Sequence, residues 1–243
     1  VLFCNGSAIG TLGNFSASTG KAKSKKTFNV SAILAAALTN GEVLRYIAEF
    51  PDDKRTILYF DTEQSPHHCQ RVMKRALRLA GLPVDRHPEN LIFAQLRALT
   101  PDFRLELIDN AIANTPNVGL VIIDGVRDLM FDINNAIESS RLIGKLMEWT
   151  DKYQIHIHTV LHLNKSDDNV RGHVGTELNN KAETVLQVCK STTDSDVTEV
   201  SASCIRSMDF PPFAFIVNES GLPEIAADYT FAGKSKVQTF SYS

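Results

Sequence analysis

The sequence predicts an α/β protein with a mostly parallel central sheet, flanking helices and an antiparallel extension toward the C-terminus. Between residues 56 and 164, short apolar runs alternate with longer amphipathic stretches. Buried parallel strands are typically unbroken runs of Val, Ile and Leu, and their alternation with helices requires a sheet covered on both faces. After residue 180, β-prone segments follow one another across polar turns, which favours antiparallel pairing.

The expected elements follow in chain order. An apolar run at 9–15 precedes an Ala-rich helix at 27–41. Buried strands are expected at 56–63, 90–96, 118–126 and 155–164, and amphipathic helices between them at 67–82, 101–116 and 134–153. The antiparallel strands are expected at 182–191, 196–206 and 213–225. We expect one domain over residues 1–228 and a polar tail over 229–243.

Composition is that of an ordinary globular protein and argues against several classes. The chain has 243 residues, 43% of them hydrophobic, and a formal net charge of −3. It is therefore not a polycation, and any nucleic-acid contact requires a local stripe of Lys and Arg. The four cysteines are scattered with no C-x-x-C pair, which argues against a zinc or disulfide framework and favours a reducing, cytoplasmic environment.

The ends and hydropathy of the chain give no sign of membrane insertion. There is no run of 18 apolar residues, so neither a transmembrane helix nor a membrane partner is expected. The first ten residues, VLFCNGSAIG, lack the basic leader and long apolar region of a signal peptide. Because the chain begins without Met and in an apparent strand, we expect a domain from a longer protein, although a trimmed sequence would look the same.

The segment GKAKSKKT, residues 20–27, is similar to a phosphate-binding loop, G-x-x-x-x-G-K-S/T. The register that places Gly20 first puts Lys26 and Thr27 at the Lys-Ser/Thr positions, whereas the register ending at Gly20-Lys21 lacks a hydroxyl at Ala22. In such a loop, backbone N–H groups at a helix N-terminus bind phosphate oxygens, the lysine neutralises them and the hydroxyl is a Mg²⁺ ligand. The expected nucleotide-binding residues are Gly20, Lys21, Ala22, Lys23, Ser24, Lys25, Lys26, Thr27 and Phe28. Taken alone, the segment is equally compatible with a basic helix start.

Lys25 is the unusual residue, because it stands where the motif has its second glycine. A lysine tolerates this position most easily with a negative φ. We therefore expect a negative φ at Lys25, with its side chain either on the phosphates or turned to solvent.

Two carboxylates strengthen the prediction of a nucleotide site. Asp124 ends the apolar run VGLVIID, which is the form of the second nucleotide motif, whose acid holds Mg²⁺ through water. Asp61 and Glu63 follow the run ILYF, and ligands of open parallel sheets bind at the carboxyl ends of strands. Glu63 therefore falls where a general base for an attacking water would lie. The alternative is that Asp61 and Glu63 only cap the next helix.

The order of these motifs resembles the RecA-like ATPases over roughly residues 8–225. The phosphate loop is followed by YFDTEQ, then LVIIDG, then a strand ending HLNK and the segment RGHVGTELNNKAETVLQV. The resemblance is strongest to DnaB-type and plasmid RepA-type hexameric helicases and related ATPases of mobile elements. It implies ATP and Mg²⁺ as cofactors, with Lys26 on the phosphates, Thr27 and Asp124 at the metal, and Glu63 as the catalytic carboxylate.

The resemblance also implies roles for residues further along the chain. His162 and Asn164 match polar residues that sense the γ-phosphate, although a satisfied sheet histidine beside His156 and His158 is an equal alternative. Lys165 and Arg171 lie in a segment that approaches nucleic acid in the family, and an ordinary surface loop is the alternative. Arg206 matches an arginine that reaches a neighbouring subunit's site, but Cys204 replaces the lysine of the family's Lys-x-Arg pair, and a solvent-facing arginine would look the same.

Three hypotheses follow. The leading one is an Mg-ATP-hydrolysing RecA-like domain that acts on DNA, which we expect to be single-stranded. It would work within a ring or filament of its own copies, such as a hexamer. Its task would be that of a helicase or DNA-remodelling ATPase of replication or mobile-element transfer. A second is a nucleotide-binding regulatory or assembly module with little hydrolysis, which Lys25 and Cys204 favour. A third, a small-molecule kinase, lacks the expected lid and arginine cluster and is disfavoured by Glu63.

Overall fold

A nine-stranded sheet forms the centre of the protein in this computed structural model, which describes residues 1–162 and 172–231. The strand order is β13-β12-β11-β10-β3-β9-β8-β6-β7. Strands β3, β6, β7, β8, β9 and β10 run parallel to one another, whereas β11, β12 and β13 add antiparallel pairs at one edge. Their bounds are β3 Phe15–Gly20, β6 Thr56–Asp61, β7 Leu91–Gln95, β8 Val118–Asp124, β9 His156–His162, β10 Thr184–Lys190, β11 Thr198–Ile205, β12 Phe213–Val217 and β13 Pro223–Ile225.

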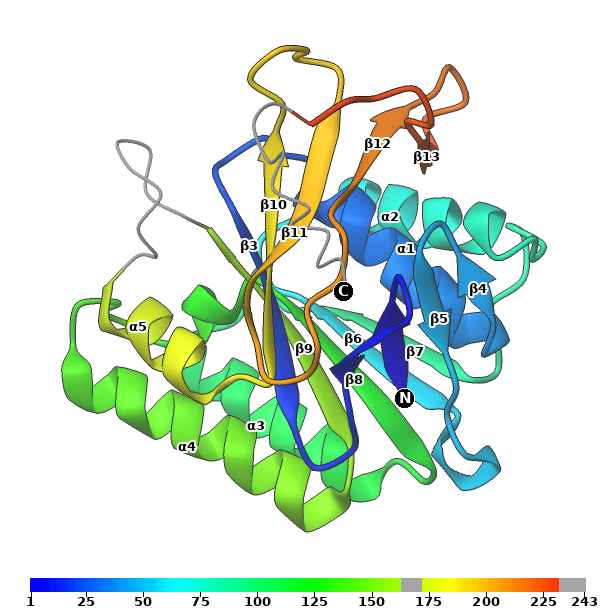
Figure 1. The fold of residues 1–243 in the computed structure, drawn as a ribbon. Coiled ribbons are helices and arrows are strands. Elements are labelled where there is room, and N and C mark those ends of the chain that lie inside the picture. Colours follow the sequence, from blue (N-terminus) through cyan, green and yellow to red (C-terminus); the bar gives the residue numbers. More distant parts are fainter. Residues whose placement is uncertain (163–171, 232–243) are drawn as a thin grey trace, which may run out of the picture.

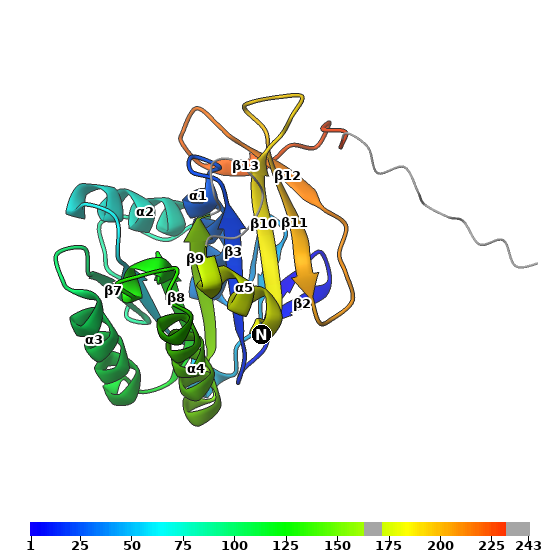
Figure 2. The same cartoon turned by 90° about the vertical axis from the view of Figure 1, so that its left-hand side faces the viewer.

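Helices cover both faces of this sheet (Figures 1 and 2). Their bounds are α1 Lys26–Thr39, α2 Pro66–Leu79, α3 Pro101–Asn114, α4 Ala136–Tyr153 and α5 Gly172–Lys181, with short 3₁₀ turns at Asp52–Lys54 and Val126–Leu129. Alternate side chains of one strand enter two separate cores. Ile57 and Tyr59 of β6 pack in the core under α1 and α2, while Leu58 and Phe60 pack in the core under α3, α4 and α5. This period of two is the reason that all four residues from 57 to 60 are apolar.

A small antiparallel sheet lies beside α1 and has the order β2-β1-β5-β4. It consists of β1 Leu2–Cys4, β2 Ser7–Gly10, β4 Glu42–Val43 and β5 Tyr46–Ala48. Tyr46 from β5 is fully buried, and its hydroxyl donates to Asn29 Oδ1 of α1 at 2.8 Å. The small sheet thus packs against the helix that follows the candidate phosphate loop.

The predicted fold class is confirmed, and the predicted strands and helices are present with bounds shifted by a few residues. The elements that were not predicted include β4 and β5 of the small sheet, strand β3 and helix α5. Strand β3, FSASTG, follows the apolar run 9–15 instead of coinciding with it, and α5 has two glycines and little apolar periodicity. Strand β3 is polar in sequence yet fully buried, because the Ser16 and Ser18 hydroxyls bond to His156 and His158 of the neighbouring strand at 2.8–2.9 Å.

The remaining expectations about domain and environment stay predictions. Most of the expected tail, 229–243, falls outside the described residues, which end at residue 231. Within the described ranges, the longest helices are too short or too polar to cross a bilayer.

Candidate nucleotide-binding site

The segment Gly20–Lys25 connects β3 to α1 at the carboxyl end of the parallel sheet. Strand β3 lies between β9 and β10, with Gly20 opposite His162. A Cβ at Gly20 would lie 2.1 Å from the Val188 carbonyl oxygen and 2.6 Å from Ser24 Oγ, so a side chain does not fit here. The first glycine of the motif is therefore explained by close packing of the loop against β10.

Lys25 has a φ of +63° and a ψ of +26°, so the prediction of a negative φ was wrong. The loop keeps the left-handed backbone that the motif's second glycine provides, and a lysine adopts it despite its Cβ. The side chain turns away from the loop, and Lys25 Nζ donates to the Asp196 carbonyl oxygen of the β10–β11 turn at 2.7 Å. Lys23 is left-handed as well, with a φ of +65°. The loop thus adopts the backbone conformation of the motif because of the contacts around it, although a lysine stands where the motif has its second glycine.

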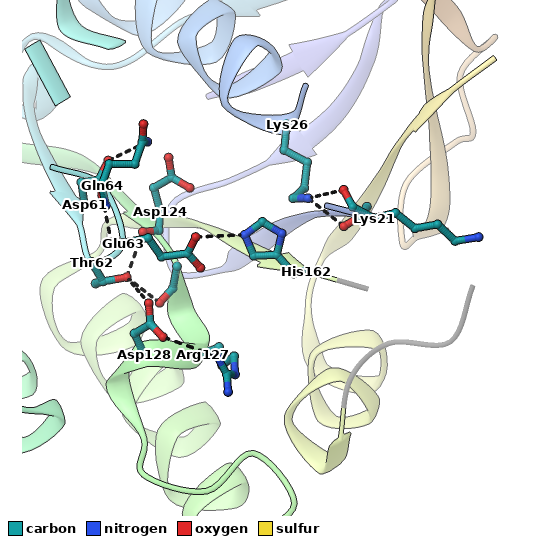
Figure 3. A network of polar contacts seen from close by, with 12 residues as sticks. Lys21, Lys26, Asp61, Thr62, Glu63, Gln64, Asp124, Arg127, Asp128 and His162 are labelled. Carbon is teal, nitrogen blue, oxygen red and sulfur yellow. Dashed lines mark hydrogen bonds and ion pairs between the residues drawn. The ribbon is translucent and has the colours of Figure 1, made fainter. Parts of the chain in front are cut away.

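Lys26 is the first residue of α1 and only 4% exposed. Its ammonium donates to the carbonyl oxygens of Gly20 at 2.7 Å and Lys21 at 2.9 Å, which holds the side chain across the loop (Figure 3). Burial lowers the pKa of Lys26 to about 8, and the nearby Asp124 and Glu63 carboxylates oppose that shift. A buried cation bonded to carbonyl dipoles is well placed to exchange them for an anion.

The N-terminus of α1 has the properties of an anion site. No side chain caps it and its first turn contains no acidic residue, so backbone N–H groups and the helix dipole are available to a ligand. Within the described residues, the buried Ser24 Oγ has no hydrogen-bond partner. Buried hydroxyls are normally satisfied, so an unpartnered one beside the loop fits a phosphate oxygen. Thr27 follows Lys26 and is half-buried at the same end of the helix.

Asp124 is the last residue of β8 and is 7% exposed. The Tyr59 hydroxyl donates to Asp124 Oδ2 at 2.9 Å. Burial first, and then repulsion from Asp61, raise the pKa of Asp124 to about 7. Ionising a buried carboxyl beside another carboxylate is unfavourable, and a nearby cation offsets that free-energy cost. Asp124 therefore favours a cation beside it.

Glu63 follows β6 and lies across the site from Lys26 (Figure 3). The Asp61 side chain fixes this turn, since Asp61 Oδ1 accepts from the backbone N–H of Glu63 at 3.0 Å and of Gln64 at 2.7 Å. Glu63 Oε2 lies 3.2 Å from His162 Nε2, and this contact is the main cause that lowers the pKa of Glu63. Glu63 is therefore ionised and oriented. Asp61 is fully buried and fixes the turn before α2 without capping that helix, whose N-cap is Ser65, and Glu63 points into the site (Figure 3).

Residues that sequence reasoning missed join β6 to β8. Thr62 Oγ1 lies 3.1 Å from the Asp124 carbonyl oxygen, 2.9 Å from that of Gly125, and 3.1 Å from Asp128 Oδ2. Gly125 has a φ of +108°, and a Cβ there would lie 2.1 Å from Thr62 Oγ1. The threonine in DTE and the glycine in IIDG are visible in the sequence. Their contact could not be predicted, because it depends on how β6 pairs with β8. Arg127 adds a positive charge that also lowers the pKa of Glu63.

The other predicted residues lie elsewhere. Arg206 follows β11, where its backbone N–H donates to the Glu183 carbonyl oxygen and Nη2 donates to that of Lys181. Glu183 N–H in turn donates to the Phe15 carbonyl oxygen, at the start of β3. Gly20 lies five residue steps beyond Phe15 along β3, so the Arg206 backbone lies roughly 17 Å from the loop of its own chain. Asn164, Lys165 and Arg171 lie outside the described residues.

Thr27 and Asp124 are the residues that could hold a metal ion. No group of three or more His, Cys, Asp or Glu side chains suited to a metal occurs in the part of the chain that the structure describes. Mg²⁺ is commonly held by one or two protein oxygens with water and phosphate oxygens completing the shell, so a hydroxyl and one carboxylate fit it.

Comparison with known proteins identifies the family. The family model described as an AAA domain matches residues 9–168. This chain belongs to that family. The match contains the loop, Glu63, Asp124 and His162, and thus the whole cluster described above.

A solved structure supports the fold independently. The protein resembles a solved structure described as "Crystal structure of the RadB recombinase", with a TM-score of 0.59 and 14% sequence identity. The match covers 87% of this chain and 90% of the recombinase chain. No curated protein sequence matches the chain. The chain is thus a member of the AAA domain family with a RecA-like fold.

Proposed function

We propose that the domain binds and hydrolyses Mg-ATP at the cluster formed by Lys26, Thr27, Glu63 and Asp124. The observation that carries this proposal is that the buried ammonium of Lys26 and the carboxylates of Glu63 and Asp124 interact electrostatically at one helix N-terminus. Cation, helix dipole and carboxylates in one place provide both a phosphate site and a metal site.

Each residue has a defined task in this proposal. Lys26 leaves the carbonyl groups of Gly20 and Lys21 and neutralises phosphate charge. Thr27 and Asp124 hold Mg²⁺, which when bound offsets charge on the phosphate oxygens. Glu63 orients a water molecule and accepts its proton, and His162 holds the Glu63 carboxylate in position. Most of the rate enhancement would come from positioning and charge stabilisation.

Arg206 is proposed to complete the site of a neighbouring subunit. Its place at the far end of the strands argues against a contact with the phosphate loop of its own chain. An arginine supplied in trans stabilises negative charge that develops during phosphoryl transfer. This role requires a ring or filament, and a hexamer of the DnaB or RepA type is the form that the motif order favours.

We further propose that the domain acts on DNA, as a helicase or remodelling ATPase in replication or mobile-element transfer. The support is the structural similarity to a protein described as a recombinase, RadB, together with the motif order described above. Lys165 and Arg171 are the proposed contacts with the nucleic-acid phosphates.

Phosphate release from ATP, measured with and without single-stranded DNA, tests the assignment of the loop. Lys26→Ala should abolish turnover in both conditions, whereas Lys152→Ala, a surface lysine on α4, should retain it. Turnover that survives in Lys26→Ala would rule out the proposed loop.

A nucleotide-binding module with little hydrolysis remains the second candidate. The hydrogen bond between Glu63 and His162 favours it, because a carboxylate so engaged is less basic toward water. Tight ATP binding without phosphate release, even with DNA present, would select this function.

A further inference from the structure

Helix α2 has a strongly cationic exposed face, although the protein as a whole is slightly acidic. Its sequence, PHHCQRVMKRALRL, contains four Arg and Lys residues and no Asp or Glu. His67, Arg71, Lys74 and Arg78, which we call the α2 stripe, follow a spacing of four, three and four residues. At about 100° per residue, these four positions fall within about 60° of one helix face and span about 16 Å.

The stripe faces solvent. His67, Arg71 and Arg78 are exposed and Lys74 is half-buried, whereas Cys69, Val72, Ala76 and Leu77 on the opposite side are buried. Within the described residues, no ion pair involves a cation of the stripe. The three aligned cations of the stripe, Arg71, Lys74 and Arg78, form a local positive patch on a chain of formal net charge −3.

The same helix is joined to both halves of the candidate site. Its N-cap, Ser65, lies two residues after Glu63, in the turn that the Asp61 side chain fixes. Arg75, one residue after Lys74, donates to Ser31 Oγ of α1 at 3.2 Å, and its guanidinium lies 3.6 Å from the centre of the Phe28 ring. Phe28 directly follows Thr27. A ligand that binds the stripe therefore acts on a helix that contacts the phosphate-loop helix and begins beside Glu63.

We propose that the α2 stripe binds the sugar-phosphate backbone of single-stranded nucleic acid and couples it to the ATP site. The coupling to the ATP site rests on the proposed function. The binding of nucleic acid does not, because it requires no hydrolysis. Cations spaced along one helix face suit a polyanion of regular charge, and the contacts fix position without reading sequence.

A second copy of the chain is the competing partner, because an acidic groove of about 970 Å³ lies between α3 and α4. Its carboxylates include Asp102 and Glu106, but Leu105, Met130 and Leu142 also line it, and Phe131 is 67% exposed beside it. Arg141 and Lys145 also line the groove and would repel the stripe, and the stripe has no large apolar side chain to cover the apolar part of the groove. The charge pattern therefore favours nucleic acid.

The test is binding of a labelled oligo(dT) to the triple variant Arg71→Gln, Lys74→Gln, Arg78→Gln. Glutamine has nearly the same helix propensity as Lys and Arg, so α2 is preserved. The control variant Arg45→Gln, Arg141→Gln, Lys152→Gln removes three exposed charges from other elements. Thermal unfolding checks that both variants are folded.

The stripe variant should bind at least about tenfold more weakly, and the slope of log K against log salt should fall by about 2, for three lost phosphate contacts. Any stimulation of ATP turnover by oligo(dT) should be lost with it. The control variant should behave as the wild type in both assays.

Unchanged oligo(dT) affinity and salt slope in the stripe variant would overturn the proposal, as would absence of binding by the wild type. A change in oligomer mass, or in binding to phosphatidylserine vesicles, with oligo(dT) binding intact would assign the stripe to another partner. The two proposals fail separately. Wild-type ATP turnover without oligo(dT) binding leaves the proposed ATPase standing, and stripe-dependent binding without turnover leaves the stripe standing.

Discussion

At the scale of single residues, the loop conformation is preserved where the expected residue type is not. Lys25 occupies the glycine position with a left-handed backbone, which costs an L-residue roughly 1–2 kcal/mol. Its side chain regains part of that cost through the bond to the Asp196 carbonyl oxygen. The strain lies directly beside Lys26, so the surrounding packing of α1 and β10 must maintain it.

Lys25→Gly and Lys25→Ala separate backbone strain from the lost side-chain bond. Both remove the bond to Asp196, but only glycine removes the Cβ that opposes a positive φ. The Gly variant should therefore have the higher free energy of unfolding of the two, by about 1 kcal/mol, and it should retain ATP turnover. Urea unfolding measures the difference. Equal stability of the two variants would show that Lys25 is unstrained.

Asp124 predicts a second effect, on the pH dependence of stability. Its pKa of about 7 exceeds the ordinary 3.8, so the folded state binds more protons between these values and the free energy of unfolding falls as pH rises through them. Asp124→Asn, measured without Mg²⁺, should melt a few degrees above the wild type near pH 8. The difference should shrink toward about pH 4. A variant less stable than the wild type near pH 8 would contradict a strongly raised pKa.

At the scale of elements, β3 and β9 are held together by polar contacts inside the sheet. Ser16 Oγ lies 2.8 Å from both His156 Nε2 and His158 Nδ1, and Ser18 Oγ lies 2.9 Å from His158 Nε2. Burial lowers the pKa of His156 to about 4 and that of His158 to about 3. These two are therefore neutral, satisfied sheet histidines, whereas His162 at the end of the same strand contacts Glu63.

The histidines predict that the fold is sensitive to acid. The folded pKa values of both histidines lie below the ordinary 6.5, so the neutral histidines contribute fully to the free energy of unfolding above about pH 6.5. As the pH falls from there toward 4, that free energy decreases by about 1.4 kcal/mol per pH unit for each histidine. His158→Gln keeps hydrogen-bonding groups and should show a shallower loss of stability over this range. Urea unfolding at several pH values measures the slopes. Identical slopes would mean that His158 does not titrate on unfolding.

The sequence predicted the apolar elements well and the polar ones poorly. Strand β6 and strand β8 are recognisable because both of their faces enter a core, so residues 57–60 and 120–123 form unbroken apolar runs. Strand β3 was not predicted, because the hydrogen-bond partners of its serines lie on β9, about 140 positions away in sequence. For the same reason, Lys26, Glu63 and Asp124 could be predicted from local motifs, whereas the contact of Thr62 with Gly125 and the path of the Lys25 side chain required the fold.

At the scale of the whole molecule, the proposed nucleotide site and Arg206 lie at opposite ends of the parallel strands. The phosphate loop, Glu63 and Asp124 lie where the parallel strands end, and Arg206 lies where they begin. A site that uses Arg206 must therefore be shared between subunits, and a heterologous contact of this kind closes into a ring or extends into a filament.

Mixing two inactive variants tests this sharing. Arg206→Ala and Lys26→Ala should each lose turnover, the first while still binding ATP. Mixed oligomers should regain part of the activity, because a Lys26→Ala subunit supplies Arg206 to the intact loop of an Arg206→Ala subunit. Phosphate release as a function of mixing ratio is the measurement. Full activity of Arg206→Ala alone would remove the arginine from the mechanism.

We propose that Glu63 drives hydrolysis at a loop that binds ATP without it. The most direct test compares ATP affinity and phosphate release of Glu63→Gln with those of the wild type, since glutamine keeps the shape but cannot accept a proton from water. Glu63→Gln should bind ATP about as well as the wild type and lose turnover by about 100-fold or more. Undiminished turnover in Glu63→Gln, or no phosphate release by the wild type with Mg²⁺ and DNA present, would contradict it.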